Sequence, residues 1–204
     1  MKSASSSSPR TKGRPRAFDP DEALDAALRV FWKQGYEGTS MSDLTDAMGI
    51  NRPSLYAAFG NKEELFAKAL DRYSAGQNCF MTRALDERTA RGVAERLLHG
   101  VVEMLCDPAT PAGCLMVQGA LCTSEAATSV RLALAVRRNT GQAAIRARLE
   151  RAVAERDLPR GSRPEDLARY LTTVMNGLSV QASGGASKKE LRRVADLALQ
   201  AWPG

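Results

Sequence analysis

The chain has 204 residues, enough for one ordinary domain or for a small domain joined to a larger one, with a sizeable core. Its formal charge of +6 favours a polyanionic partner, and no apolar run is long enough to suggest a membrane span. The polar run after the first basic residue argues against a secretion signal. We therefore expect a cytoplasmic protein whose thiols are reduced.

The positive charge is concentrated in an N-terminal arm, residues 1–18. The arm has no acidic residue before position 19 and five basic residues: Lys2, Arg10, Lys12, Arg14 and Arg16. Removing these five from the 29 bases leaves 24 against 23 acids in the rest of the chain. The Ser- and Pro-rich composition predicts a disordered arm, and Arg14 and Arg16 would suit the negative potential of an A/T-rich minor groove. The alternative is a tail that only keeps the protein soluble.

The first helix after the arm has a clear start signal. Asp19 can cap it, Pro20 suits its first turn, and Glu22 completes a capping pair. Apolar residues then recur at helical spacing and predict one buried face. Gly35 suits a left-handed residue just past the helix end.

Two short helices are predicted next, at residues 39–48 and about 52–59. Thr39 or Ser40 can cap the first and Asn51 the second, and a glycine-containing turn joins them. This is the layout of a helix-turn-helix, in which the second short helix enters the major groove of DNA. The sequence therefore predicts duplex DNA as a partner.

The rest of the chain is predicted to be helical. The expected ranges are 62–85, 90–106, 112–122, 125–156, 162–183 and 187–201. Ser162 and Ser187 are the expected caps of the last two helices. Because no strand pattern competes, we predict an all-α fold with a three-helix DNA-binding head at 19–62. A helical effector-binding and dimerisation domain would follow at 63–204.

Three motifs carry a family resemblance. The runs T-S-x-x-D-L from Thr39, G-I-N-R-P-S-L-Y-A-A-F from Gly49 and K-E-E-L-F from Lys62 resemble the TetR family of bacterial one-component repressors. The resemblance implies a homodimer on a palindromic DNA operator, with an inducer held in the helical body. It also implies that six head residues contact DNA: Thr39, Arg52, Pro53, Ser54, Tyr56 and Lys62.

The resemblance implies different DNA contacts for different residues of the head. It implies that recognition-helix residues read bases, and that Tyr56 and Lys62 hold phosphates. The chemistry agrees, because an Arg can bridge guanine O6 and N7 and a Tyr hydroxyl or Lys ammonium suits a phosphate oxygen. The two alanines after Tyr56 offer only methyl groups, so base readout would depend mainly on Arg52 and Ser54. The alternative for Tyr56 is that it only packs the head.

The last two predicted helices carry apolar stripes that could form a four-helix dimer interface. The expected interface residues are Leu171, Val174, Leu178, Leu191, Val194 and Ala198. Similar stripes also occur in the core of a single protomer, so the spacing alone leaves both interpretations open. The resemblance favours a homodimer, which would read half-sites one helical turn, or a multiple of it, apart.

Two kinds of signal could release such a repressor from DNA. A small molecule could bind a pocket lined by Met104, Cys114, Met116, Gln118, Leu121, Met175 and Leu178. Alternatively, an oxidant or electrophile could modify Cys114, since the start of a helix lowers the pKa of a thiol. The Gly113-Cys114-Leu115 run resembles a sequence in TetR members that sense such reagents. Packing alone is the alternative for all these residues.

Other classes of protein fit the sequence less well. It has no hydrolase elbow, zinc-protease motif or phosphate loop, so we do not expect an enzyme or a cofactor. The four cysteines lack metal-ligand spacing and His99 is the single histidine, so no metal site is expected. The alternative from a different class is a constitutive, non-specific DNA-packaging protein, which would not need the helical body.

Overall fold

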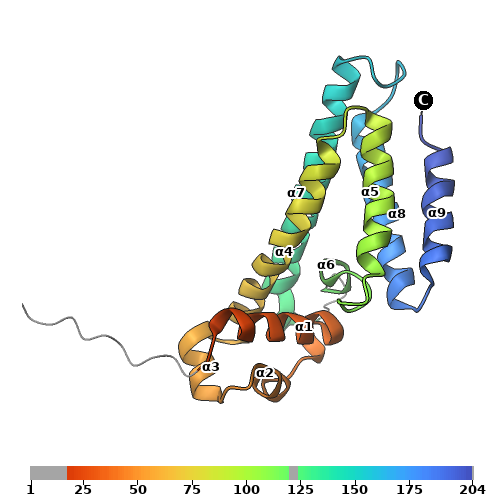
Figure 1. The fold of residues 1–204 in the computed structure, drawn as a ribbon. Helices are drawn as coiled ribbons and strands as arrows, with labels where there is room; N and C mark the ends of the chain where they lie inside the picture. The colour runs from red at the N-terminus through yellow and green to blue at the C-terminus, as the bar shows by residue number, and fades with distance from the viewer. Residues whose placement is uncertain (1–17, 120–123, 204) are drawn as a thin grey trace, which may run out of the picture.

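The computed structural model describes residues 18–119 and 124–203, and within these ranges it contains helices and no strand (Figure 1). The helices are α1 Pro20–Gly38, α2 Met41–Met48, α3 Arg52–Phe59, α4 Lys62–Leu85, α5 Ala90–Leu105, α6 Leu115–Gln118, α7 Thr128–Ala154, α8 Pro164–Ser183 and α9 Lys188–Gln200. The predicted all-α class is confirmed. Helices α1 to α3 form a head at one end of the body (Figure 1), and none of the helices in the described ranges could cross a membrane.

Side-chain caps set the starts of the head helices as the sequence predicts. Asp19 caps α1, and Ser40 and Asp43 form a capping box at the start of α2. The Asn51 side chain accepts a hydrogen bond from the Ser54 backbone N–H at 2.9 Å. These bonds satisfy backbone N–H groups that a helix start leaves unpaired. The start of each helix is therefore fixed by residues within three positions of it.

The end of α1 differs from the expectation. Gly35 has the expected positive φ, at 73°, and breaks the helix with ψ of 172°, but α1 continues beyond this kink to Gly38. Thr39 closes the break, because its hydroxyl donates to the Gly35 carbonyl at 2.6 Å. Ser40, rather than Thr39, therefore caps α2.

Two elements of the body also differ from the sequence prediction. α6 covers only Leu115–Gln118, with Cys114 in an extended conformation before it and Gly113 at φ of 89°. α8 begins after Arg163, and its first turn holds Pro164 without any side-chain cap, so Ser162 is not the cap. Proline has no backbone N–H that needs a hydrogen-bond acceptor, and its φ is already helical. Pro164 can therefore begin α8 without a side-chain cap.

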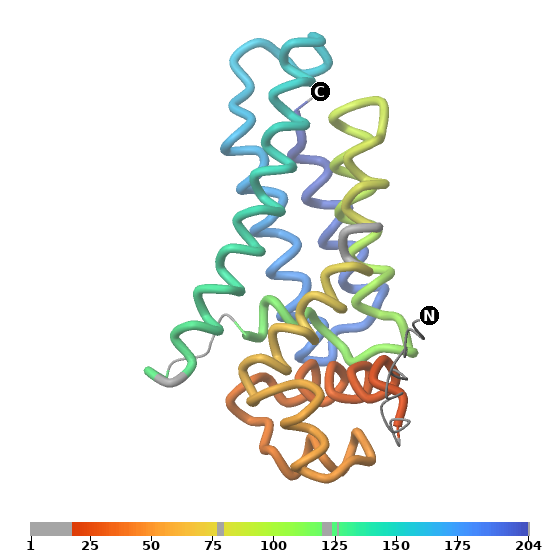
Figure 2. The backbone as a smooth tube through the Cα atoms, turned by 90° about the vertical axis from the view of Figure 1, so that its left-hand side faces the viewer, coloured from red at the N-terminus to blue at the C-terminus, as the bar shows by residue number. Residues whose placement is uncertain are grey.

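Apolar side chains form two clusters. One fills the body between α5, α7, α8 and α9, and its largest fully buried members include Leu97, Leu98, Ile145 and Leu149. The other joins the head to the lower part of α4, with Phe31, Leu44, Leu55, Leu65 and Phe66 at its centre. Three body residues complete this second cluster: Leu115 of α6 and Val130 and Leu134 of α7. Figure 2 shows the start of α7 near the level of the head, and this second cluster is shared by head and body.

Candidate functional site

Helix α3 turns one face to the head core and the other to solvent. Leu55 and Phe59, one turn apart, are buried, whereas Arg52, Pro53 and Tyr56 are exposed. Half of the Tyr56 side chain's surface is accessible, at 50% exposed, which argues against a purely packing role. Residues four apart share a helix face, so Arg52 and Tyr56 point to the same side. This outward face is available to enter a DNA groove.

The other expected DNA contacts have varied surroundings. Ser54 is half-buried, and its backbone N–H is held by the α3 cap. Thr39 is only 1% exposed, and its hydroxyl donates a hydrogen bond to the Gly35 carbonyl. Its side chain is therefore buried, although a DNA contact requires it at the surface. Lys62 is half-buried, with Nζ 4.5 Å from the centre of the Tyr36 ring. Arg14 and Arg16 lie outside the described residues.

The head by itself is acidic. Residues 19–70 carry five basic and nine acidic side chains, a net charge of 5 − 9 = −4. Many of the acids serve the fold: Asp19, Asp21, Asp25, Glu37, Asp43 and Glu64 accept hydrogen bonds from the protein. Ser40 bonds lower the pKa of the Asp43 carboxyl, so this acid stays ionised in its capping box. Helix α3 contains no acid, which keeps negative charge off the exposed face.

A short segment, residues 113–118, connects the head to the body. The Trp32 indole N–H of α1 donates to the Gly113 carbonyl at 3.0 Å, and this bond is buried. The Tyr73 hydroxyl of α4 donates to Cys114 Sγ at 3.1 Å, and the Trp32 and Tyr73 rings meet edge to face at 4.7 Å. From the other side, Arg138 of α7 donates to the Met116 carbonyl at 2.7 Å. A shift of this segment would therefore move its hydrogen-bond partner Trp32 and, with it, α1.

Cys114 has apolar surroundings and accepts a hydrogen bond from Tyr73. The thiol is partly buried and packs against both core clusters. Burial and the contact with Cys114 raise the pKa of Tyr73, so its hydroxyl stays protonated and acts as the donor. The sequence singled out Cys114 but neither aromatic residue that ties it to the head, because no local pattern links positions 32, 73 and 114.

The expected effector pocket is not assembled as one cavity. Leu178 is 1% exposed within the body core, and Met104 and Met175 pack against that core. Met116 packs instead against the head cluster, and Leu121 lies outside the described residues. Gln118 Nε2 donates to the Ala112 carbonyl and to Ser183 Oγ, each at 3.3 Å. The described side chains that were expected to form one pocket thus pack in the two apolar clusters or bond to the loop before α6.

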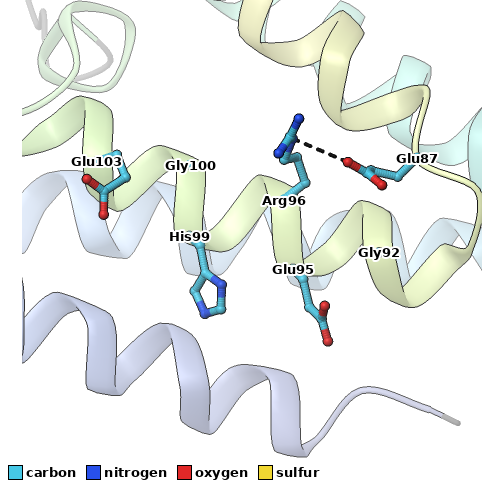
Figure 3. Close-up of a pocket in the computed structure, with 7 residues that line it drawn as sticks. All are labelled: Glu87, Gly92, Glu95, Arg96, His99, Gly100 and Glu103. Atoms are coloured by element: carbon cyan, nitrogen blue, oxygen red, sulfur yellow. Dashed lines mark ion pairs between the residues drawn. The ribbon is translucent and has the colours of Figure 1, made fainter.

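Open space lies instead along the outside of α5. A hollow of about 370 Å³ is lined by Glu87, Gly92, Glu95, Arg96, His99, Gly100 and Glu103, as Figure 3 shows. A larger one of about 740 Å³ shares Arg96, Gly100 and Glu103 with it and extends to Gly76 of α4 and Lys188 of α9. We call the two together the α5 groove. Of the expected pocket residues, Met104 lines its larger part.

The expected dimer-interface residues belong mainly to the protomer core. Leu171, Leu178, Leu191 and Ala198 are buried, and Val174 packs against the same core. Val194, in contrast, is 48% exposed. The apolar stripes thus bind α8 and α9 to the body, which was the alternative interpretation. Apolar side chains that remain exposed on these helices are Val180, Val194 and Leu197.

Comparisons with known proteins cover nearly the whole chain. The family model for "Bacterial regulatory proteins, tetR family" matches residues 23–69, and that for "Tetracyclin repressor-like, C-terminal domain" matches residues 94–198. The transcriptional repressor ComR of Escherichia coli K12 is 32% identical over 196 residues, covering 95% of this chain and 93% of ComR. BdcR of the same organism, also named a transcriptional repressor, is 30% identical over 94% of this chain and 93% of its own.

A solved structure is similar in both sequence and shape. The TetR family regulator CifR, a cysteine mutant complexed with 26-base-pair double-strand operator DNA, is 42% identical with a TM-score of 0.90. The match covers 93% of this chain and 100% of that one. A TetR regulator from Rhodococcus sp. RHA1 is also 42% identical, with a TM-score of 0.62 over 91% of this chain and 99% of its own.

Proposed function

This chain belongs to the TetR family of bacterial regulatory proteins, and from that premise we propose that it is a homodimeric transcriptional repressor of a palindromic operator, released by a small-molecule effector. The observation that carries the proposal is the exposed face of α3, whose opposite face is fixed in the core that the head shares with the body. The operator complex of CifR, at 42% identity, supports the same use of this face.

The direct test of this function is selection of bound sequences from random DNA duplexes. A preferred palindrome, bound by two protomers, is the expected result. Equal binding to any duplex of the same length would instead identify a non-specific DNA-packaging protein. Because a packaging protein and a repressor would share the basic arm, sequence preference is the property that separates them.

In the proposed complex, α3 lies in the major groove and each exposed side chain has a separate task. Arg52 bridges guanine O6 and N7, and the Tyr56 hydroxyl donates to a phosphate. Lys62, held beside the Tyr36 ring at the start of α4, contacts a phosphate next to the groove. The basic arm, with Arg14 and Arg16, follows the adjacent minor groove.

Substitution of Arg52 and of Lys62 should separate base reading from phosphate binding. Arg52→Ala is expected to cost about 1–3 kcal/mol of operator binding and to relax preference at one base pair per half-site. Lys62→Ala should weaken all sequences alike and reduce the salt dependence by about one phosphate contact. Binding titrations on single-base operator variants at several salt concentrations would measure both. An unchanged base preference in Arg52→Ala would remove that residue from the readout.

We place the dimer interface on the outward faces of α8 and α9. Val180, Val194 and Leu197 are apolar and 57%, 48% and 62% exposed in the protomer. Burial of such side chains against a second copy is favourable, at about 25 cal/mol per Å² of apolar surface. Two copies related by a two-fold axis would then present two heads to the two half-sites.

Release from DNA would pass through the segment 113–118. An effector that shifts this segment changes the Trp32–Gly113 and Tyr73–Cys114 contacts, and hence the position of α1 and α4. An effector that prefers the non-DNA-binding state by about 2–3 kcal/mol would weaken operator affinity roughly 30- to 150-fold. That range is sufficient for a regulatory switch.

A second candidate trigger is covalent modification of Cys114, favoured by its position against Tyr73 and the head. An electrophile would form a bond to the Cys114 sulfur as the thiol loses its proton. The adduct would not fit the partly buried site beside Tyr73, because interiors are close-packed. The aromatic pair of Tyr73 and Trp32 would be displaced with it.

N-ethylmaleimide is a suitable probe of the cysteine trigger. If Cys114 is the trigger, treatment should lower operator affinity of the wild type at least about 30-fold, a coupling free energy of roughly 2 kcal/mol. Cys114→Ser should stay bound, whereas the matched control Cys106→Ser should still be released. Operator affinity before and after treatment is the measurement. Unchanged binding of the treated wild type would leave Cys114 a packing residue.

A further inference from the structure

The α5 groove has open space beside Gly76 of α4. Its larger part runs between α4 and α9 over the surface of α5. Gly76 of α4 and Gly100 of α5 line it, and a Cβ atom at Gly76 would meet nothing within 4 Å. Gly100 instead accommodates the Phe80 ring, since a Cβ there would come within 2.2 Å of a ring carbon. Its volume of about 740 Å³ is in the range of small-molecule sites.

The groove offers both apolar surface and charge. Its apolar lining consists of Phe80, Met104, Cys106 and Pro108. Phe80 and Met104 also pack against the body core, which holds this surface in place. An aromatic ring beside a thioether suits an aryl or alkyl group of a ligand. The apolar part of a ligand would therefore lie on Phe80 and Met104.

In the larger hollow, though not in the smaller one, basic side chains outnumber acidic ones. Arg83, Arg96 and Lys188 line the larger hollow together with two acids, Glu103 and Asp107. Arg96 is paired with Glu87 of the smaller hollow at 3.4 Å, as the dashed line in Figure 3 marks. Asp107 is turned into its own loop, where its side chain accepts from the Ala109 backbone N–H at 2.9 Å.

Glu103 is shared between two cations. It pairs with Lys188 and also with Arg192, whose guanidinium lies 3.2 Å away. Lys188 and Arg192 lower the pKa of the Glu103 carboxyl, as expected in a locally positive field. One carboxylate between two cations leaves capacity for a second anionic group.

We propose that the larger hollow of the α5 groove binds an amphipathic organic anion, with its hydrocarbon part on Phe80 and Met104 and its carboxylate near Lys188, and that this is an effector site. The inference rests on the proposed repressor function for its regulatory role, but not for the binding itself.

The groove is connected to the head by a short stretch of chain. Cys106, Asp107 and Pro108 form its wall at the end of α5. Five residues further on, Gly113 accepts the hydrogen bond from Trp32 of α1. A ligand that displaces this wall therefore acts on the segment 113–118 and, through it, on the head.

Three probes with one aromatic body and different head groups test the proposal: 4-phenylbutyrate, 4-phenylbutylamine and 4-phenylbutan-1-ol. Calorimetric titration of the full chain should give affinity for the carboxylate at least about tenfold above that for the amine. Gly76→Leu fills the open space and should weaken carboxylate binding at least about tenfold, whereas Ala75→Leu, on the same helix but outside the groove, should not. Lys188→Gln should weaken only the carboxylate, and its neighbour Lys189→Gln should have no effect.

Operator binding is then measured separately, with and without 4-phenylbutyrate. Release of the wild type but not of Gly76→Leu is the expected result. Equal or tighter binding of the amine, wild-type affinity in Gly76→Leu, or no binding by any probe up to its solubility limit would overturn the site. Binding of the carboxylate without operator release would overturn its effector role. If no preferred operator exists, the repressor function fails while the calorimetric result still decides the site.

Discussion

Removal of residues 2–16 is expected to lower operator affinity at least about 100-fold at physiological salt. The reason is the charge of the head, because residues 19–70 carry −4 and the first 16 residues carry +5. Without the arm, an acidic head would approach a polyanion. The slope of log affinity against log salt should also fall by about 0.9 for each phosphate that the arm neutralises in the wild type. Operator titrations from low to moderate salt would measure both quantities.

A variant that keeps the length of the arm isolates its charge. Replacement of Lys2, Arg10, Lys12, Arg14 and Arg16 by Gln should reproduce the loss of affinity and the shallower slope. Replacement of the serines at positions 5–8 by Gly should change neither. A charge-free arm with wild-type affinity and slope would show that the arm is only a solubilising tail.

Leu197→Glu is expected to convert the dimer to monomers at micromolar concentration and to lower operator affinity at least about 100-fold. A two-fold interface contains Leu197 of both copies, so the substitution would bury two carboxylates that have no cationic partner. A monomer would contact one half-site and lose the advantage of two linked sites, which is worth roughly 10²–10⁴ in affinity. Sedimentation analysis and operator titration would measure the two effects.

Val153→Glu is the matched control, since Val153 is 41% exposed and lies near the end of α7 and not on α8 or α9. It should leave both dimerisation and operator binding unchanged. A fully dimeric Leu197→Glu variant would move the interface elsewhere. Because Leu197 is 62% exposed, this substitution should not unfold the protomer.

The head could be predicted closely because its signals are local. The capping box of Ser40 and Asp43 and the cap of Asn51 each involve residues three positions apart. The exposed face of α3 follows from the burial of Leu55 and Phe59 at helical spacing. Thr39 is the exception, since its burial depends on the kink at Gly35, which the sequence suggested as a helix end.

The body could be predicted less well because its arrangement depends on contacts between distant residues. An apolar stripe such as Leu171 and Leu178 shows that a face is buried, but not whether the same chain or a second copy buries it. The bond between Trp32 and Gly113 joins residues 81 positions apart, and no spacing rule reveals it. The length of α6 likewise depends on the contacts of residues 113–118.

The core shared by Leu115, Val130 and Leu134 with the head has a further consequence. A DNA-binding unit cut off after α3 or α4 would expose the apolar surface that these three side chains cover. The head is therefore not an independent module that could be exchanged between proteins without its body. Folding of the DNA-reading surface is coupled to that of the sensing domain, so a protomer with a damaged body should lose DNA binding altogether instead of becoming a permanent repressor.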